Sequence, residues 1–565
     1  MAKVISIGNQ SFESIREKDN FYVDKTNFIK EWWDNDDIVT LITRPRRFGK
    51  TLNMSMLECF FSNKYKDRGD LFESLEIWKD EKYRKLQGTY PVIFLSFASI
   101  KGNTFELAKN QIYEKIAELY ENNRFLLESD CMSDTEKAKY RSFLENPIDK
   151  DVSFALNSLS KYLSSYFGKN VIILLDEYDT PMQEAYVNGY WVELVAFTRS
   201  LFNAAFKTNP YLERAIMTGI TRVSKESIFS DLNNLKVITV TSDEYSKCFG
   251  FTEDEVFAAL DEQGLSSEKE KVKLWYDGFT FGDEKDVYNP WSIINFLDEK
   301  KYKTYWADSS SNGLVNELIR TGSAEIKKTM ETLIAGGTVE KNIDEQIVFE
   351  QLKTNKDAVW SLLLASGYLR VETFRTEGRL NKKIYSLKLT NYEVEQMFGT
   401  MIERWFGGAD VPYNEFISAM ISGDLESMNE YMNRVTRGVI SYFDTGKTPS
   451  DEEPERFYHG LVLGLMVDQV DNYILNSNRE SGYGRYDIML EPIDKTNEKY
   501  PGIVIEFKVI NPRKENSLEE TVASALEQIE EKNYDAELIK RGVKEENIHH
   551  YGFAFKGKEV LIDGR

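Results

Sequence analysis

The segment IVTLITRPRRFGKTLNMSMLECFF, residues 38–61, decides the fold of the first half of the chain. Its β-branched beginning predicts a buried strand over residues 38–43, and the residues from Leu52 onward follow a helical pattern. In a phosphate-binding loop, backbone N–H groups and the start of a helix surround phosphate oxygens, while Lys and Ser/Thr side chains reach phosphate and Mg²⁺. The segment therefore predicts a nucleotide site made by Arg47, Phe48, Gly49, Lys50 and Thr51.

The loop departs from the general phosphate-loop pattern at its beginning. Arg44 occupies the position of the first glycine, and Pro45 has no backbone N–H group. Taken alone, Gly49-Lys50-Thr51 is also compatible with an ordinary helix cap. The interpretation therefore depends on the strand before it, the helix after it and further motifs downstream.

Two later strand ends supply those motifs. The run VIILLDEYD, residues 171–179, predicts a strand that ends in Asp176 and Glu177. We expect Asp176 to bind Mg²⁺ together with Thr51, and Glu177 to polarise the attacking water. The sequence thus predicts a nucleotide site with Mg²⁺ as its metal.

The segment MTGITR, residues 217–222, ends another expected strand. Thr218 and Thr221 are candidates for sensing the γ-phosphate, and Arg222 for contacting it. Polar residues at the end of a strand are also common without any such function.

The last part of the chain contains a second candidate site. Asp487 lies in the expected strand GRYDIML, and Glu506 and Lys508 share one face of the strand GIVIEFKVI. Two neighbouring carboxylates suit Mg²⁺, which activates water, and the lysine can orient the nucleophile. An exposed cross-strand ion pair is the alternative reading of Glu-x-Lys. Further candidates are Glu455, His459 and Gln528.

These motifs resemble two known families. FYVDKTNFI, LITRPRRFGKTLNMSML, LLDEYDTPM and TGITRVSKESIFSDLNNL look like the bacterial AAA-ATPase-like family, in which an arginine commonly stands at the position of Arg44. The resemblance covers roughly the first 300 residues and implies ATP binding at Lys50, Thr51, Asp176 and Glu177. FYHG, GRYD, EFK and ALEQIEEKNY resemble the PD-(D/E)XK nuclease superfamily over about the last 110 residues.

The expected fold class is α/β, with a parallel-sheet P-loop domain first and a restriction-endonuclease-like α/β domain last. Between them, SGYLRVETF and KIYSLKLT predict the hairpin of a winged-helix-like region. We expect an AAA-ATPase-like domain over 1–250, a helical lid over 251–308, a helical and winged-helix-like connector over 309–444, and a nuclease-like domain over 451–565.

Charge and composition limit the partners. The formal net charge of -22 opposes non-specific attraction to nucleic acid or anionic membranes, so nucleic-acid contacts must be local. We expect a cytoplasmic protein without a membrane partner, because no apolar run of about 18 residues and no signal-peptide pattern occurs. A second copy of the chain or a protein partner remains compatible with the sequence.

Three functions follow as hypotheses. The first is an ATP-dependent or ATP-regulated nuclease acting on DNA or RNA, in a defence or mobile-element setting. The second is an ATP-driven switch or scaffold whose nuclease-like domain binds nucleic acid or protein without cleaving. The third, a ring-forming protein-remodelling ATPase, lacks a recognisable arginine-finger helix or threading loop.

Overall fold

A computed structural model of the chain divides into two compact units. The first contains residues 1–311 and 340–393, and the second contains residues 312–339 and 394–565. The structure describes residues 3–145, 152–221, 229, 232–309, 315, 318–319, 324–334, 336–344, 358–378, 382–406, 413–439, 472–477, 480–481, 484–485, 487–510, 515–556 and 559–565.

The first unit is built around a five-stranded parallel sheet in the order β2-β3-β4-β1-β5. Its strands are β1 (Val39–Thr43), β2 (Val92–Ser96), β3 (Val171–Asp176), β4 (Leu212–Gly219) and β5 (Leu235–Ile238). Residues of β1 and β3 are buried throughout, as expected for strands with helices on both faces. The expected P-loop type of α/β sheet is confirmed.

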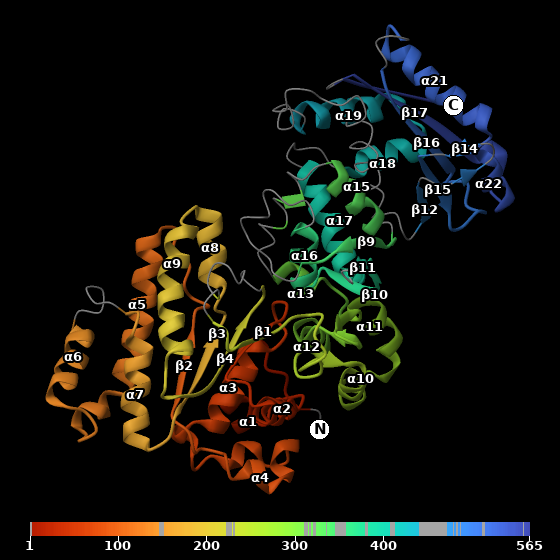
Figure 1. The fold of residues 1–565 in the computed structure, drawn as a ribbon. Coiled ribbons are helices and arrows are strands. Elements are labelled where there is room, and N and C mark those ends of the chain that lie inside the picture. Colours follow the sequence, from red (N-terminus) through yellow and green to blue (C-terminus); the bar gives the residue numbers. More distant parts are fainter. Residues whose placement is uncertain are drawn as a thin grey trace. The chain divides into compact units, whose positions relative to one another are not determined.

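Helices cover the two faces of this sheet (Figure 1). Helices α2 (Asn27–Asn35) and α3 (Lys50–Phe61) pack their apolar residues against Ile42, Ile172 and Ile216. The other face carries α5 (Phe105–Asn122), α7 (Ala155–Phe167) and α9 (Trp191–Phe202). Further helices of this part are α1 (Phe12–Glu17), α4 (Glu81–Arg84), α6 (Asp134–Glu145) and α8 (Thr180–Asn188).

The segment after the sheet contains more than the helical lid expected from its sequence. Besides the helices α10 (Glu253–Glu262), α11 (Lys269–Tyr276) and α12 (Pro290–Glu299), it forms a three-stranded sheet in the order β6-β8-β7. The strands are β6 (Phe251–Thr252), β7 (Phe279–Phe281) and β8 (Glu284–Tyr288). Gly278 and Gly282, with φ of 119° and 56°, provide the turns that admit this hairpin between helices.

The first unit ends with an antiparallel hairpin that the sequence predicted. Strands β10 (Leu369–Glu377) and β11 (Lys382–Leu389) pair directly, and β9 (Val339–Asn342) pairs with β11. Helices α13 (Tyr305–Ser309) and α16 (Ala358–Ala365) accompany them, and α17 (Tyr392–Phe406) carries the chain into the second unit. The unit division and the expected domain boundaries differ, and the boundary expected near residue 450 lies outside the described residues.

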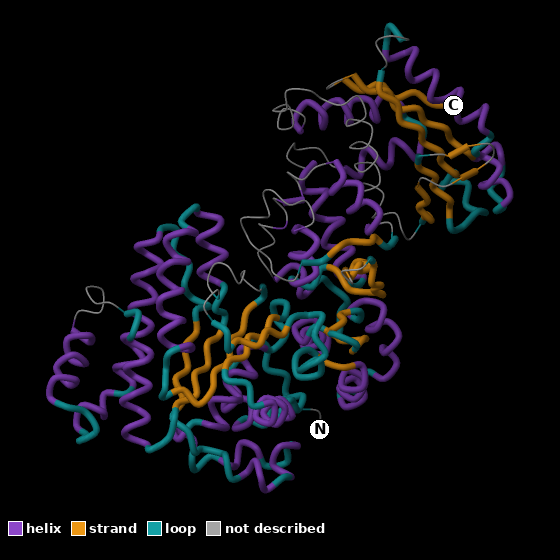
Figure 2. The backbone as a smooth tube through the Cα atoms, viewed as in Figure 1, coloured by secondary structure: helices purple, strands orange, loops and turns teal. Residues whose placement is uncertain are grey.

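The second unit is helical first and then mixed α/β. Its helices are α15 (Ala324–Ile334), α18 (Tyr413–Ser422), α19 (Leu425–Val439), α21 (Leu518–Lys532) and α22 (Asp535–Lys540). Its five-stranded sheet has the order β12-β15-β16-β17-β18, and β16 and β17 are its parallel pair. Figure 2 draws the strands of this sheet in orange and the helices beside it in purple. The strands are β12 (Tyr473–Ser477), β15 (Ile488–Pro492), β16 (Gly502–Val509), β17 (Ile548–Lys556) and β18 (Glu559–Gly564), beside a short hairpin of β13 (Glu480–Ser481) and β14 (Gly484–Arg485). The expected nuclease-like α/β fold is confirmed.

Strand alternation gives this second sheet two different faces. Ile503, Ile505 and Phe507 point toward a core that also contains residues of α18 and α19. Val504 lies on the opposite face with Leu526 and Ile529 of α21. Glu506 and Lys508 share the face of Val504, since side chains two residues apart point the same way.

None of the helices in the described part of the chain combines the length and the apolar character that crossing a bilayer requires.

Candidate functional site

The phosphate-loop candidate lies at the carboxyl end of the parallel strands. The loop follows β1, and Gly49 caps α3 with a φ of 78°, a conformation that glycine adopts at little cost. The backbone N–H of Asn53 closes the first helical turn on the carbonyl of Gly49 at 2.9 Å. This geometry leaves the N–H groups of the first turn available for an anion.

A chain of hydrogen bonds connects three of the predicted residues. The Thr51 hydroxyl donates to Asp176 Oδ2 at 2.8 Å, and the Thr218 hydroxyl donates to Asp176 Oδ1 at 2.6 Å. Strand β4 lies between β1 and β3, so Thr218 reaches Asp176 from the neighbouring strand. Burial raises the pKa of Asp176, against the effect of these hydroxyl donors. The two hydroxyl groups therefore fix a fully buried carboxyl group at the end of β3.

Lys50 is buried at the start of α3 and faces the loop itself. Its Nζ donates to the carbonyl oxygens of Arg44 at 3.0 Å and Pro45 at 2.8 Å. Burial lowers the pKa of Lys50, and the charges of Glu177, Asp179 and Asp176 oppose that shift. An ammonium group with three acidic neighbours and few water contacts is well placed to bind a phosphate oxygen.

Glu177 follows Asp176 in the left-handed backbone region, with a φ of 50°. Its backbone N–H donates to the Thr218 hydroxyl at 3.4 Å, and its carboxylate accepts from the Thr180 hydroxyl at 3.2 Å. The side chain lines the same cavity as the loop residues. Glu177 thus lies beside the loop with a carboxylate positioned by Thr180.

Asp179 is a residue of this region to which the sequence interpretation gave no role. Its buried carboxylate accepts from the backbone N–H of Ile220 at 3.0 Å and of Thr221 at 2.9 Å, and from the Thr221 hydroxyl at 3.0 Å. Burial raises the pKa of Asp179, which these donors counteract. Asp179 therefore orders the segment after β4. In the sequence, the signal for Asp179 was its position as the third acidic residue of LLDEYD.

Arg44 stabilises the backbone at the beginning of the loop. Its fully buried guanidinium donates to the carbonyl oxygens of Thr43 at 2.9 Å and Thr239 at 2.7 Å. It also stacks 4.6 Å from the ring centre of Phe281, and burial lowers its pKa to about 10. The arginine at the first-glycine position therefore fixes the beginning of the loop to the end of β5.

A cavity of about 710 Å³ opens beside the loop. Its lining includes loop residues 46–51, Phe21 and Tyr22 of the N-terminal segment, and Trp291 of α12. The guanidinium of Arg47 lies 4.1 Å from the ring centre of Trp291. A cavity of this size, with apolar walls and a phosphate loop at one side, can hold a nucleotide.

The N-terminal residues Tyr22, Asp24 and Lys25 contribute unequally to this cavity. Tyr22 and Lys25 line it, whereas Asp24 accepts from the backbone N–H groups of Thr26 at 2.9 Å and Glu76 at 2.7 Å. Lys25 pairs with Glu255 at 2.7 Å. Asp24 therefore stabilises the local backbone.

The second candidate site lies on the α21 face of the C-terminal sheet. Asp487 immediately precedes β15, whose Ile488 pairs with Ile505 of β16. The Asp487 carboxylate accepts from the backbone N–H of Phe507 at 2.9 Å. Asp487 therefore lies next to Glu506, which is 5% exposed.

Gln528 of α21 connects the two charged residues of β16. Its Nε2 donates to Glu506, and its Oε1 accepts from Lys508 Nζ at 2.8 Å. Its Nε2 also lies 3.3 Å from the Tyr534 hydroxyl. The structure thus brings together four predicted residues: Asp487, Glu506, Lys508 and Gln528.

Three other candidates from the sequence, Arg222, Glu455 and His459, lie outside the described residues.

Both places have ligands that suit a hard divalent cation. Thr51 and Asp176 offer a hydroxyl and a carboxylate oxygen 2.8 Å apart. Asp487, just before β15, and Glu506, on the adjoining strand β16, offer two carboxylates. Mg²⁺ prefers such oxygen ligands and usually takes one or two carboxylates. The residues of both places therefore fit Mg²⁺.

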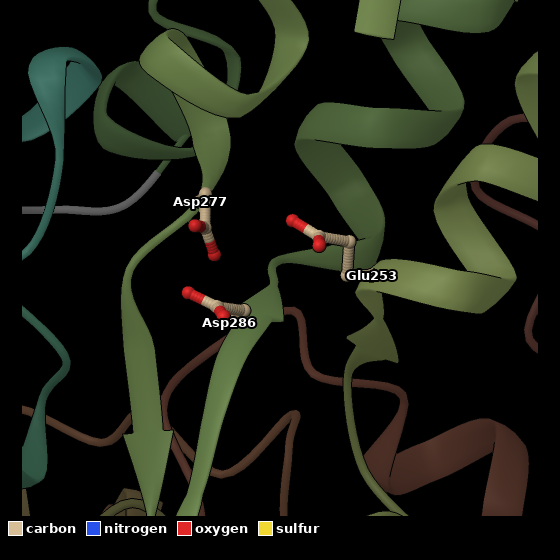
Figure 3. Close-up of side chains that lie close together, drawn as sticks. All are labelled: Glu253, Asp277 and Asp286. Atoms are coloured by element: carbon tan, nitrogen blue, oxygen red, sulfur yellow. The ribbon is translucent and has the colours of Figure 1, made fainter. Parts of the chain in front are cut away.

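A third acidic cluster, unrelated to the sequence predictions, lies in the segment after the parallel sheet (Figure 3). Oxygens of Glu253, Asp277 and Asp286 lie within 4.8 Å of one another. Lys273 pairs with Glu253, and its Nζ is 4.0 Å from Asp277. Burial, and then the negative charge of Asp286, raises the pKa of Asp277 to about 7. The cluster thus already contains a cation of the chain, and Asp277 binds a proton near neutral pH.

Comparisons with known proteins match two parts of the chain to known families. Residues 6–229 match the family model of predicted AAA-ATPases, and residues 453–564 match that of the PD-(D/E)XK nuclease superfamily. An uncharacterized protein from the vnfD 5' region of Azotobacter chroococcum mcd 1 is 26% identical over 396 residues, which cover 70% of this chain and 68% of that protein. The chain therefore joins a predicted AAA-ATPase-like domain to a domain of the PD-(D/E)XK nuclease superfamily.

Proposed function

We propose that this protein is an ATP-regulated nuclease, in which ATP binding and hydrolysis by the first domain control phosphodiester cleavage of DNA or RNA by the last. The observation that carries the proposal is the set Asp487, Glu506, Gln528 and Lys508 on one sheet face, in a chain that also has a phosphate-loop cavity. Each place has residues suited to phosphate chemistry.

In the first domain, Lys50 and the loop N–H groups bind the phosphates of ATP, and Thr51 and Asp176 hold Mg²⁺. When bound there, the ion would neutralise charge on the phosphate oxygens. Glu177 orients the attacking water and accepts its proton, and Thr180 fixes the carboxylate for that task. Thr218 donates to Asp176 and so holds this carboxylate in place.

In the last domain, Asp487 and Glu506 hold a divalent cation. When bound there, such a cation would lower the pKa of a water molecule and stabilise negative charge on the scissile phosphate. Lys508 orients the nucleophile. Gln528 fixes the positions of the Lys508 and Glu506 side chains through its hydrogen bonds to both. Because the surroundings of this site are acidic, it holds nucleic acid by local contacts and not through a wide basic surface.

The test compares wild type with Lys50→Ala and Asp487→Ala on single- and double-stranded DNA and RNA, with Mg²⁺ and with or without ATP. We expect Asp487→Ala to abolish cleavage and retain ATP turnover. Lys50→Ala should lose ATP binding together with the ATP dependence of cleavage. A wild type that leaves every nucleic acid intact under all conditions contradicts the proposal.

A second function is favoured by one observation. Residues 451–565 hold 24 Asp and Glu against 15 Lys and Arg, which weakens attraction to a polyanion. The chain would then be an ATP-driven switch whose nuclease-like domain binds a partner without cleaving. Under this alternative, Glu506→Ala leaves partner binding and the cellular effect unchanged.

A further inference from the structure

The phosphate loop is held by side chains from beyond the segment that matches the ATPase family. The carbonyl oxygen of Arg46 accepts from Trp306 Nε1 at 3.0 Å and from Asn289 Nδ2 at 3.3 Å. Trp306 is 1% exposed, and its ring lies 5.4 Å from those of Phe279 and Tyr368. The indole therefore packs against two aromatic rings while it donates to the loop.

The Arg46 carbonyl, which accepts from Trp306 and Asn289, also fixes the orientation of the Arg47 backbone N–H. Because a trans peptide is planar, the C=O of Arg46 and the N–H of Arg47 point in opposite directions from one rigid unit. Arg47 lines the nucleotide cavity. Any reorientation of the Arg47 N–H toward a phosphate must turn the Arg46 carbonyl relative to Trp306.

Trp306 is in turn held by Glu393. The Glu393 carboxylate is fully buried and accepts from the backbone N–H of Trp306 at 2.6 Å and of Ala307 at 3.4 Å. It also accepts from the Ser292 hydroxyl at 2.8 Å. A buried carboxylate with several donors allows little displacement of either partner, since lost bonds to a buried charge are costly.

A second contact reaches the loop from the hairpin. Gly367, with a φ of 87°, lies so close to Pro45 that a Cβ there would be 2.9 Å from Pro45 Cγ. The Thr390 hydroxyl donates to the Gly367 carbonyl at 2.7 Å. Both contacts connect the loop to residues 390–393, where α17 begins.

We propose that Trp306 and Glu393 are positioning residues that transmit the nucleotide state of the phosphate loop to the start of α17. The proposal rests on the proposed function, because it requires that the loop binds nucleotide. Glu393 is the last residue of the first unit, and the chain enters the second unit at Val394. A displacement of Glu393 is therefore passed to the second unit by covalent continuity.

Hydrogen exchange of the full chain, followed by mass spectrometry with and without ATP and Mg²⁺, tests this coupling. In wild type, ATP should slow exchange in residues 44–51 and change it in residues 390–394. Trp306→Phe keeps an aromatic ring and removes the donor to Arg46. We expect its loop to remain protected by ATP, with affinity roughly two- to tenfold weaker, and its response at 390–394 to be lost.

Trp32→Phe is the matched control. Trp32 is fully buried, and its Nε1 has no hydrogen-bond partner among the described residues, so this variant makes the same change without loss of a loop contact. It should retain both responses. Ser292→Ala supplies a second test if Trp306→Phe does not fold, because it loosens Glu393 and leaves the loop contacts in place. It should weaken the response at 390–394 alone.

The outcomes separate the two proposals. ATP protection of the loop with no response at 390–394 in wild type overturns the coupling and leaves ATP binding intact. A full response at 390–394 in Trp306→Phe, or in Ser292→Ala where that variant replaces it, also overturns the coupling. Absence of any ATP effect on residues 44–51 in wild type instead refutes nucleotide binding, and the coupling with it.

Discussion

At the scale of single residues, the same residue type has different functions according to its neighbours. Asp176 lies between two hydroxyl donors, whereas Asp179 accepts from two backbone N–H groups and one hydroxyl. Both carboxyl groups are buried within three residues of each other. Hydrogen bonding thus distinguishes a candidate metal ligand from a residue that orders a loop.

Glu177→Gln should separate ATP binding from ATP hydrolysis. The amide keeps the shape of the side chain and loses the base, so we expect turnover to fall by about 100-fold or more. Affinity for ATP should stay within about threefold of wild type, since the loop contacts remain. Steady-state turnover and nucleotide titration measure the two quantities, and the exposed Glu193→Gln serves as control. Unchanged turnover would contradict the role of Glu177.

Gln528→Leu should weaken cleavage by the C-terminal site. The change removes the side chain that connects Glu506 and Lys508. Loss of such an outer partner typically costs about 10- to 100-fold in metal affinity or activity. Cleavage rates as a function of Mg²⁺ concentration check this, with the exposed Glu527→Gln on the same helix as control. Equal rates in Gln528→Leu and wild type would show that the connection has no catalytic importance.

Asp277→Asn should change how stability depends on pH. The pKa of Asp277 is about 7 in the folded protein and about 3.9 in an unfolded chain. Between pH values of about 4 and about 7, the folded state therefore binds one proton at Asp277 that the unfolded chain has lost. Because of this, the free energy of unfolding falls as the pH rises through this range. The asparagine imitates the protonated acid and should avoid this loss.

Urea unfolding at about pH 5 and about pH 8 measures the difference. At the higher pH, the free energy of unfolding of Asp277→Asn should exceed that of wild type by at least about 1 kcal/mol, given about 1.4 kcal/mol for each unit of pKa difference. The exposed Asp298→Asn is the control. A variant that is less stable than wild type at both pH values would contradict a protonated Asp277.

At the scale of elements, close packing of helix on strand places the C-terminal residues. Gly552 of β17 pairs in register with Glu506 of β16. A Cβ at Gly552 would lie 2.9 Å from the carbonyl oxygen of Val522 and 3.2 Å from Ala525 Cβ. Absence of a side chain at this position therefore brings α21, and with it Gln528, against the sheet.

Gly552→Ala should displace α21. Overpacking of this kind costs about 1 to 3 kcal/mol, and cleavage should fall further than stability alone explains. Chemical unfolding and cleavage rates, measured at a temperature where the variant is folded, test both effects. Wild-type cleavage in a destabilised but folded variant would show that the position of α21 does not matter for the site.

At the scale of the whole molecule, the chain has two compact units, and the cavity beside the phosphate loop lies in the first. ATP should therefore stabilise the first unit selectively. At about 100 times the dissociation constant, a ligand adds about 2.7 kcal/mol to the folded state.

Differential scanning calorimetry should show two transitions, and ATP with Mg²⁺ should raise the midpoint of one of them. Lys50→Ala should remove that shift and leave the other transition unchanged. Equal shifts of both transitions in wild type would mean that nucleotide binding stabilises the two units together.

Local patterns were enough for much of this fold. The apolar run before Gly49, the strand ending in Asp176-Glu177 and the alternation around Glu506 depend on neighbours in sequence. The sequence alone therefore predicted the parallel sheet, the β10–β11 hairpin and the strands β15 and β16. The short strands β6 to β8 were missed, because two- to five-residue strands carry little periodicity.

The sequence by itself thus determined the two α/β domains and which residues end their strands. Only the tertiary structure decided that β4 lies between β1 and β3, which brings Thr218 to Asp176, and that Arg44 is buried against Phe281. It also decided that Trp306, whose backbone N–H donates to Glu393, donates from its indole to Arg46 of the loop, 260 residues away along the chain. Contacts between residues so far apart follow from strand order and packing, which no local pattern of side chains encodes.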